Sequence, residues 1–427
     1  MTLFLSAKQI VDLLYQFKFL DYIMVIAAAG LIVYKAAKEY RASGEKGFAG
    51  YVVNAVKKNF CLTDALILIL AVLVGLSLLR NLNGFSEACA IESAFLVYLL
   101  GRVYGKEVLK AGKYLAYVGY AIIYVNGSYY LVKSIDYYSH EGYPWPHLGE
   151  LKNSGALYYY KTDLGIAILF ASVFIYCFSK VLIAKYFTIF VVNVVFLFNT
   201  YARSSQAVYV LFLICICIIE LCKLIKKIRN KNKDKRELSK ERKPIKSLKK
   251  IIWVGTVVCI TIMSVAVTVC HISPIKKIPY SELEISEETA EKIEDLFHSR
   301  QIIWWDTLHF MMNDSPVTEA VGVDIDGDSF SKHNSISQLS HSMYLTIIYG
   351  IGMVGFTVFL CLMWSLFCNV ITLRQNKGNI EIMMITIASF IIFLIMGLTT
   401  DALEFTQISW FPFIFAGMAV SEAKINE

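Results

Sequence analysis

Charged side chains are scarce in this sequence. Only 18% of the 427 residues are Asp, Glu, Lys or Arg, whereas 57% are hydrophobic. Soluble domains usually carry about 25% charged residues, so the composition excludes an ordinary water-soluble domain of this length. The deficit indicates a chain whose surroundings are largely apolar.

The long hydrophilic segments also lack cysteine. Disulfides and thiolate metal sites need cysteines in such segments, so this absence excludes a disulfide-stapled external domain and a thiolate metal motif. We further expect no cleavable signal peptide, because the first residues lack a short apolar core that ends in small residues. The ten cysteines fall almost entirely in apolar segments, where they predict packing roles: Cys61, Cys89, Cys177, Cys215, Cys217, Cys222, Cys259, Cys270, Cys361 and Cys368.

What the sequence does contain is a series of apolar runs close to 20 residues long. A helix of that length crosses a bilayer core of about 30 Å, and the runs are too long for barrel strands. We therefore predict an all-α, polytopic transmembrane helical bundle of about 11 spans (10–12), preceded by an interfacial amphipathic helix at 1–17. The predicted spans are 19–36, 62–80, 86–104, 114–132, 163–180, 183–200, 206–222, 251–270, 341–368, 380–399 and 406–422.

The basic residues are unevenly distributed, and this predicts an orientation. The segment 223–250 holds fourteen Lys and Arg against three acids. Such a run between apolar segments is typical of a cytoplasmic loop and of contact with membrane lipids, and it argues against a nucleic-acid partner. We divide the chain into an N-terminal transmembrane bundle (1–222), a basic cytoplasmic loop (223–250) and a C-terminal transmembrane bundle (251–427). The last includes a large extracytoplasmic loop at 271–340, and all seven histidines fall on the extracytoplasmic side.

Three places on that side are candidates for chemistry. Arg203 lies in a turn between two apolar spans, and His341 lies where a span begins. Arg300 lies near the start of an apolar segment that contains Trp304, and the spacing of this segment predicts a helix along the membrane. Each has a plain alternative. Arg203 could snorkel to the interface, Arg300 could belong to a loop helix whose charges face water, and His341 could be structural. Trp304, Tyr344 and His333 are candidate substrate-binding residues.

The spacing after His341 resembles that of the O-antigen polymerase and O-antigen ligase superfamily. Leu345, Gly352 and Gly355 follow His341 by four, eleven and fourteen residues, as in the family's His-Asn-x-Tyr-Leu and Gly-x-x-Gly motifs. The resemblance extends over roughly 183–370. The chain departs from it at Ala202, where Ser is usual, and at Ser342, where Asn is usual. The glycine stretch after Pro316 is imperfect, and the pair His333-Asn334 is a second candidate for the functional histidine.

The resemblance implies a GT-C-like fold in the bacterial cytoplasmic membrane. It also implies metal-independent, inverting glycosyl transfer without a cofactor, at the outer face of that membrane. The donor would be an undecaprenyl-diphosphate-linked oligosaccharide, and the product an O-antigen, capsule or exopolysaccharide. Arg203 and Arg300 would bind the diphosphate, since arginine offers paired donors to phosphate. His341 would orient or deprotonate the acceptor, or donate to the diphosphate. A chain-length regulator and a flippase are the protein partners it implies.

Weaker signals accompany these. Asp401 and Glu404 lie between the last two spans and could bind substrate or act as a general base, although the sequence favours a solvated turn. The segment 324–328 (Asp-Ile-Asp-Gly-Asp) lacks the spacing of a calcium loop, so we expect no metal. A ligase and a flippase or other transporter remain alternative functions. Mid-span segments almost free of charge favour surface chemistry over transport.

Overall fold

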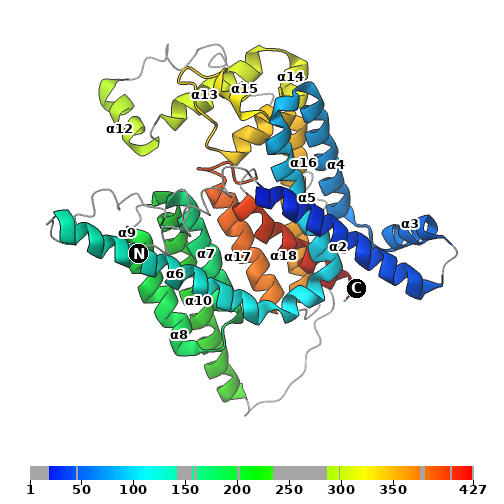
Figure 1. The fold of residues 1–427 in the computed structure, drawn as a ribbon, viewed down its shortest axis with the longest axis vertical. Coiled ribbons are helices and arrows are strands. Elements are labelled where there is room, and N and C mark those ends of the chain that lie inside the picture. Colours follow the sequence, from blue (N-terminus) through cyan, green and yellow to red (C-terminus); the bar gives the residue numbers. More distant parts are fainter. Residues whose placement is uncertain are drawn as a thin grey trace. The chain divides into compact units, whose positions relative to one another are not determined.

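The computed structural model describes residues 19–44, 47–141, 156–157, 161–199, 202–233, 286–297, 299–375, 380–403 and 406–425. Every regular element in these ranges is a helix (Figure 1). The prediction of an all-α chain is therefore confirmed for the described part of the protein.

Four helical segments are long and apolar enough to cross a membrane. They are Leu62–Arg80, Leu82–Lys110, Arg203–Leu221 and Met343–Leu373. They coincide with four predicted spans, at 62–80, 86–104, 206–222 and 341–368. Four further predicted spans fall on the shorter apolar helices Thr162–Phe178, Leu182–Leu197, Ile382–Met396 and Ile408–Ala423.

The remaining predicted segments have different outcomes. The predicted spans 19–36 and 114–132 lie within two other helices, α2 and α6. The span at 251–270 and the interfacial helix at 1–17 lie outside the described residues. The total of about 11 spans and the GT-C-like fold therefore stay predictions.

The described helices form two compact units, which are considered separately below. The first unit contains α6 (Gly112–Glu141), α7 (Lys161–Phe178), α8 (Leu182–Phe187), α9 (Asn193–Asn199) and α10 (Arg203–Lys233). The second unit contains α2 (Phe19–Ser43), α3 (Phe48–Asn59), α4 (Leu62–Arg80), α5 (Phe85–Lys110, except its last two residues), α12 (Glu287–Phe297), α13 (Arg300–Asn313), α14 (Pro316–Val321), α15 (Gly327–Ser331), α16 (Met343–Gln375), α17 (Ile380–Met396) and α18 (Thr406–Ile425).

In the first unit a buried polar network supports an irregular helix. A π-helical turn, Thr188–Val192, joins α8 to α9. Such a turn disturbs the regular helical ladder, and the Tyr209 hydroxyl from α10 donates to the Ile189 carbonyl at 2.8 Å. Beside it, the Asn193 amide donates to the Ser172 hydroxyl of α7 at 2.7 Å. Hydrogen bonds thus link α7, α9 and α10 within an apolar interior, while Asn193 Oδ1 has no partner among the described residues.

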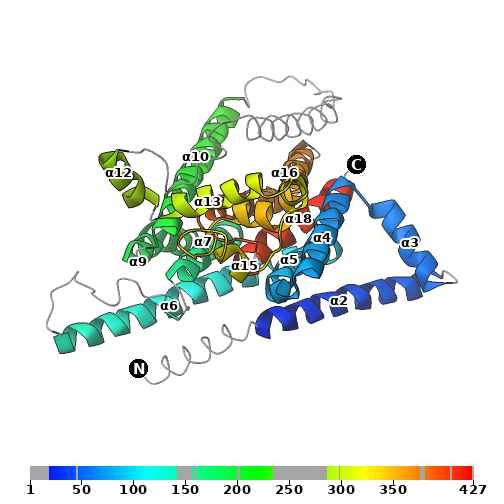
Figure 2. The same ribbon diagram turned by 90° about the horizontal axis from the view of Figure 1, so that it is seen from above.

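The second unit is built around α4 and α16, which lie side by side in both ribbon views (Figures 1 and 2). Near the start of α4, the Thr63 hydroxyl is 2.7 Å from the hydroxyl of Ser365. Near its end, the Ser77 hydroxyl donates to the Gly350 carbonyl at 2.7 Å. The helices are therefore antiparallel, and the N-terminal end of α16 meets the C-terminal end of α4.

A close contact joins α5 to α18 in the same unit. A Cβ added to Gly101 would lie 2.1 Å from the Ile414 carbonyl oxygen, and one added to Gly417 would lie 2.1 Å from the Tyr98 carbonyl oxygen. Only glycine allows two helix backbones to approach so closely. The rings of Phe95 and Phe413, 5.8 Å apart, pack nearby.

The helix α16 is broken at Gly352, where the backbone has φ 70°. The C-terminal end of α14 fills the break, because a Cβ on Gly352 would lie 2.3 Å from the Ala320 carbonyl oxygen. Gly322 also has a positive φ, 79°, and Val323 N donates to the Tyr349 carbonyl at 2.7 Å. At Gly352 the close partner is thus the glycine stretch after Pro316.

Arg80, at the end of α4, fixes that loop. Its Nη1 donates to the carbonyls of Val321 at 2.8 Å and Gly322 at 2.7 Å, and a third carbonyl, that of Val323, lies at 3.2 Å. These carbonyls follow a short helix and would otherwise lack donors. The loop therefore packs firmly on the α4–α16 pair at what we call the site end of the second unit.

The opposite end, which we call the paired end, carries an ion pair. Arg102 of α5 and Asp64 of α4 approach to 3.0 Å, and their side chains are only 12% and 10% exposed. The Tyr98 hydroxyl donates to Asp64 Oδ1 at 2.7 Å, and Arg102 Nη2 donates to the Asn59 carbonyl at 2.8 Å. Arg102 thus joins the two helices α4 and α5.

Candidate functional site

The helix α13 places the first candidate residue. Its interior face consists of Ile303, Thr307 and Met311, spaced by four residues and all buried, so the prediction of a helix in this segment is confirmed. Ser299 precedes it with a left-handed backbone, φ 64°. Arg300 is the first helical residue and is half-buried.

Trp304 and Asp306 attach α13 to the segment between His333 and His341. The Trp304 indole Nε1 donates to the Ser340 carbonyl at 3.1 Å, directly before His341. Asp306 Oδ2 accepts from Ser335 N at 3.0 Å. Trp304, predicted as a substrate-binding residue, thus fixes the position of the segment that carries the candidate histidine.

His341 lies in a strained turn before α16. Its φ is 48°, a left-handed value that costs most non-glycine residues about 1 to 3 kcal/mol. The turn is held by Met343 N, which donates to the carbonyls of Gly397 at 2.9 Å and Thr400 at 3.0 Å. The neighbouring segments over-determine the backbone here, and this is the condition under which such strain persists at functional sites.

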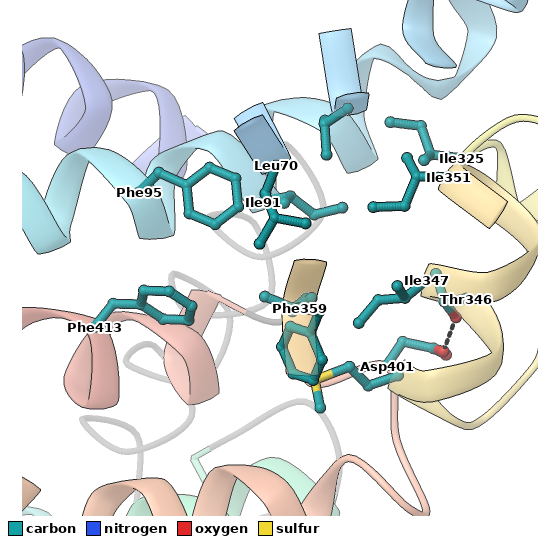
Figure 3. A pocket seen from close by; sticks show the side chains of 13 residues that line it. Leu70, Ile91, Phe95, Ile325, Thr346, Ile347, Ile351, Phe359, Asp401 and Phe413 are labelled. Carbon is teal, nitrogen blue, oxygen red and sulfur yellow. Dashed lines mark hydrogen bonds between the residues drawn. The ribbon is translucent and has the colours of Figure 1, made fainter. Parts of the chain in front are cut away.

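Asp401 is buried beneath this turn, and its side chain is not that of a solvated turn residue. Its exposed fraction is 7%, and Asp401 Oδ1 accepts from the hydroxyls of Ser340 and Thr346, the latter at 2.5 Å (Figure 3). The carboxylate therefore joins the segment before α16, the first turn of α16 and the α17–α18 connection. The second oxygen, Oδ2, makes no hydrogen bond to any described residue.

Arg300, His341 and Asp401 form an electrostatic cluster within the second unit. Burial lowers the pKa of the His341 imidazole below its ordinary value of 6.5. The Asp401 charge opposes this shift, and the Arg300 charge adds to it. Burial also lowers the pKa of Arg300, again opposed by Asp401. A guanidinium remains protonated despite such a shift, so at neutral pH the cluster holds a cation beside an uncharged imidazole.

The polar groups of this cluster have unused hydrogen-bonding capacity. Among the described residues, no hydrogen bond or ion pair reaches the Arg300 guanidinium, and none reaches the His341 ring. A half-buried guanidinium has five N–H donors, and leaving them unsatisfied is costly. The arrangement is therefore suited to binding an anion at Arg300 and a hydroxyl at His341.

Behind Asp401 lies a small apolar cavity. Its volume is about 20 Å³, room for a single water-sized molecule. Figure 3 shows aromatic and aliphatic side chains from α4, α5, α16 and α18 around it, with Asp401 and Thr346 at one side. A sugar or a lipid chain does not fit, so this cavity is a void of the core and not a substrate site.

The other predicted residues have separate places. The Tyr344 hydroxyl donates to the Leu394 carbonyl at 2.7 Å, which favours a role in packing α16 against α17. His333 Nδ1 lies 2.9 Å from the Ser329 carbonyl oxygen and 2.8 Å from the Tyr349 hydroxyl. Glu404 lies outside the described residues.

Arg203 belongs to the first unit. It is the first residue of α10, its side chain is exposed, and it follows the buried Ala202. The sequence predicted Arg203 within a turn, whereas Arg203 is already helical, and the preceding helix α9 ends at Asn199. Its joint action with Arg300 and His341 stays a prediction.

The acidic segment 324–328 is structured by its own hydrogen bonds. Asp324 Oδ1 accepts from Asp326 N at 3.0 Å, and Asp326 Oδ1 accepts from Asp328 N at 3.1 Å. The Asn81 amide donates to Asp326 Oδ2 at 3.0 Å. Within the described ranges, no group of three or more His, Cys, Asp or Glu side chains has the arrangement of a metal site.

Sequence reasoning missed the residues that support the cluster. Ser340 and Thr346 bind Asp401, and Arg80 and Ser77 bind the loop and the broken helix. For Arg80 there was a usable signal, since it is a charged residue directly after an apolar run. For the hydroxyl groups there was none, because Ser and Thr within or beside apolar segments usually bond to their own helix.

No protein-family model, curated protein or solved structure matches the chain.

Proposed function

We propose that the protein is a polymerase of a bacterial surface polysaccharide. It transfers a glycan from undecaprenyl diphosphate to another lipid-linked repeat unit at the extracytoplasmic face of the cytoplasmic membrane. The observation that carries the proposal is the cluster of Arg300, His341 and Asp401. Within the described residues, its guanidinium and its imidazole form no hydrogen bond or ion pair. The four helices that are long and apolar enough to cross a membrane support a lipid-borne substrate.

Arg300 serves the leaving group in this proposal. When the bond between the anomeric carbon and the diphosphate oxygen breaks, its electron pair stays on that oxygen and negative charge builds up there. A guanidinium donates two parallel hydrogen bonds to a phosphate and keeps its charge throughout. Partial burial strengthens that interaction relative to water and holds the donors in place before the reaction.

His341 serves the acceptor. The acceptor hydroxyl oxygen forms the new bond to the anomeric carbon from the face opposite the diphosphate, which gives inversion. Its proton passes to the uncharged imidazole, and the Asp401 charge stabilises the resulting imidazolium. A pKa of His341 below its ordinary value keeps the ring uncharged and able to accept a proton at neutral pH. The side chain of Asp401 is itself oriented by Ser340 and Thr346.

Arg203 is the second diphosphate ligand in the proposal. It is an exposed cation at the first residue of α10, where the helix dipole also favours an anion. A diphosphate carries more charge than one guanidinium neutralises, so a metal-independent transferase benefits from a second cation.

The test is to incubate the purified protein in detergent with a lipid-diphosphate-linked repeat unit and without any nucleotide. We expect a ladder of glycan lengths, lost in Arg300→Ala and Arg203→Ala and reduced in Arg300→Lys, because an ammonium loses the paired geometry. One discrete product on a different acceptor would instead support a ligase. Full activity of Arg300→Ala in folded protein would contradict the proposed mechanism.

One observation bears on the alternative of a transporter. Transporters bind ions and substrates at broken helices, and α16 is broken at Gly352. Here, however, two backbone carbonyl groups beside the break already accept hydrogen bonds. The Tyr349 carbonyl accepts from Val323 N, and the Gly350 carbonyl accepts from Ser77. This favours a structural role for the break, and glycan flipping in vesicles without a ladder would be the contrary result.

A further inference from the structure

A second polar region lies farther along α13, on the side away from Arg300. It is an open cleft of about 470 Å³, far larger than the cavity behind Asp401. Its lining comes from the second half of α13 and from the segment after α15, and consists of Asp306, His309, Phe310, Asn313, Asp314, His333 and Ser335.

The two carboxylates of the cleft are held in place and still have bonding capacity. Asp306 Oδ2 accepts from Ser335 N at 3.0 Å, and Asp314 Oδ2 accepts from Thr318 Oγ1 at 2.5 Å. Within the described residues, the Oδ1 atoms of both carboxylates accept no hydrogen bond. Each fixed carboxylate can therefore accept from a hydroxyl or an ammonium group of a ligand.

The two histidines add further polar atoms. His309 Nε2 is buried and has no hydrogen-bond partner among the described residues. A buried polar atom without a partner is costly, so a polar group that reached this nitrogen would be favoured. His333 Nδ1 lies 2.9 Å from the Ser329 carbonyl oxygen and 2.8 Å from the Tyr349 hydroxyl. Both contacts are made by Nδ1, so Nε2 has no hydrogen bond to a described residue.

The cleft also contains an aromatic surface. The rings of Phe310 and His333 stack with centroids 4.1 Å apart and planes 24° apart. Flat rings beside fixed hydrogen-bonding groups suit a pyranose, which has C–H groups on its faces and hydroxyls around its edge. Among the described residues, no Lys or Arg lines the cleft. Two carboxylates without a cation disfavour an anionic sugar.

We infer that this cleft is a subsite for neutral or amino sugars of the glycan, away from the reacting end. The inference rests on the proposed function. His309 follows Arg300 by nine residues of one helix, a rise of about 14 Å. At that separation the cleft binds sugars beyond the one that reacts at His341, and α13 joins the diphosphate site to the glycan site.

The test uses the oligosaccharide released by mild acid from the lipid-linked repeat unit of the source cells. Saturation-transfer NMR with the purified full-length protein measures its binding. We expect Asp314→Asn and Phe310→Leu, which nearly preserve side-chain size, to weaken binding about tenfold each. For Asp314→Asn this is the scale of one hydrogen bond to a charged group. Asp328→Asn, which changes an exposed carboxylate outside the lining, should bind as wild type does.

The polymerisation assay gives the second readout. Asp314→Asn and Phe310→Leu should raise the KM for the acceptor about tenfold while kcat stays within about twofold, because the cleft lies away from the reacting atoms. Equal binding to these variants and to wild type, or saturation confined to a uronic acid, would overturn the inference. If oligosaccharide binding follows the cleft but wild type makes no ladder, the subsite stands and the polymerase proposal fails.

Discussion

The two ends of the second unit use arginine in opposite ways. At the paired end, Arg102 binds Asp64 and the Asn59 carbonyl, and both charged side chains are almost fully buried. At the site end, Arg300 lies near Asp401 but makes no ion pair with any described residue. The same side chain thus completes a structural contact at one end and remains available for a ligand at the other.

The contrast extends to the backbone. No non-glycine residue of α4 or α5 has a positive φ, whereas Ser299 and His341 at the site end both do. Arg80 supports the site end without joining the cluster, since its guanidinium donates to backbone carbonyls. The difference teaches that a charged residue in an apolar chain becomes a candidate for function only when its hydrogen-bonding groups are not already used within the protein.

The largest expected contrast comes from removing each arginine. Arg300→Ala should lower polymerisation about a thousandfold, the scale lost with an arginine that stabilises a transferring phosphate, and should leave thermal stability nearly unchanged. Arg102→Ala leaves the Asp64 carboxylate buried without its cation and should cost about 3 to 5 kcal/mol of stability. The measurements are ladder formation per folded molecule and thermal unfolding in detergent. The reverse assignment of effects would contradict the comparison.

The next effect concerns the broken helix that supports the site end. Gly352→Ala should destabilise the protein by about 2 kcal/mol or more, because alanine at φ 70° is strained and its Cβ would meet the Ala320 carbonyl oxygen at 2.3 Å. Gly75→Ala in α4 is the matched control. Nothing lies within 4 Å of its added Cβ, so we expect unchanged or slightly higher stability. Equal melting temperatures of the two variants would show that α16 tolerates a regular helix at Gly352.

A smaller effect should appear at His341 itself. Both His341→Gly and His341→Ala remove the imidazole, so both should be inactive. Glycine adopts φ 48° without the penalty that alanine incurs, so the glycine variant should be more stable by about 1 kcal/mol. Thermal unfolding of the two variants measures the difference. An alanine variant as stable as the glycine variant would show that the turn relaxes once the imidazole is gone.

The smallest expected effect is a change in the pKa of His341. Burial and the Arg300 charge lower this pKa, and the Asp401 charge raises it. Arg300→Gln should therefore raise the pKa and Asp401→Asn should lower it further. In wild type the pKa of His341 is lower in the folded protein than in the unfolded chain. As pH falls below about 6.5, the unfolded chain therefore binds the proton first, and His341 lowers the free energy of unfolding at acid pH. NMR titration of labelled histidine, assigned with His341→Gln, measures the shifts, and shifts of the same sign would contradict the cluster.

Much of the helical organisation is predictable from the sequence. Apolar runs of span length located the helices at 62–80 and 206–222 because hydrophobicity and length together determine which segments cross a membrane. The break at Gly352 was not predictable from hydropathy. It arises because the glycine stretch near Gly322 packs on α16, and that contact joins residues thirty positions apart.

The sequence predicted Arg300 and His341 as members of the candidate site, but not the buried hydrogen-bonding role of Asp401 beside them. Spacing identified Arg300 and His341 as candidates, and the structure describes them beside Asp401, for which the sequence favoured a solvated turn. Burial of Asp401 depends on Ser340 and Thr346, whose hydroxyls carry no distinctive pattern. The cleft around His309 and Phe310 was not foreseen, since its residues are ordinary loop and helix residues until the fold assembles them.

The most direct measurement is the binding of a soluble lipid diphosphate, farnesyl diphosphate, to the purified protein by calorimetry. We expect wild type and Arg80→Gln to bind alike if folded, because Arg80 bonds to backbone carbonyls, and Arg300→Gln to bind at least about tenfold more weakly. Unchanged affinity in Arg300→Gln, with the protein folded, would contradict the claim that the site end holds its arginine for a phosphate anion.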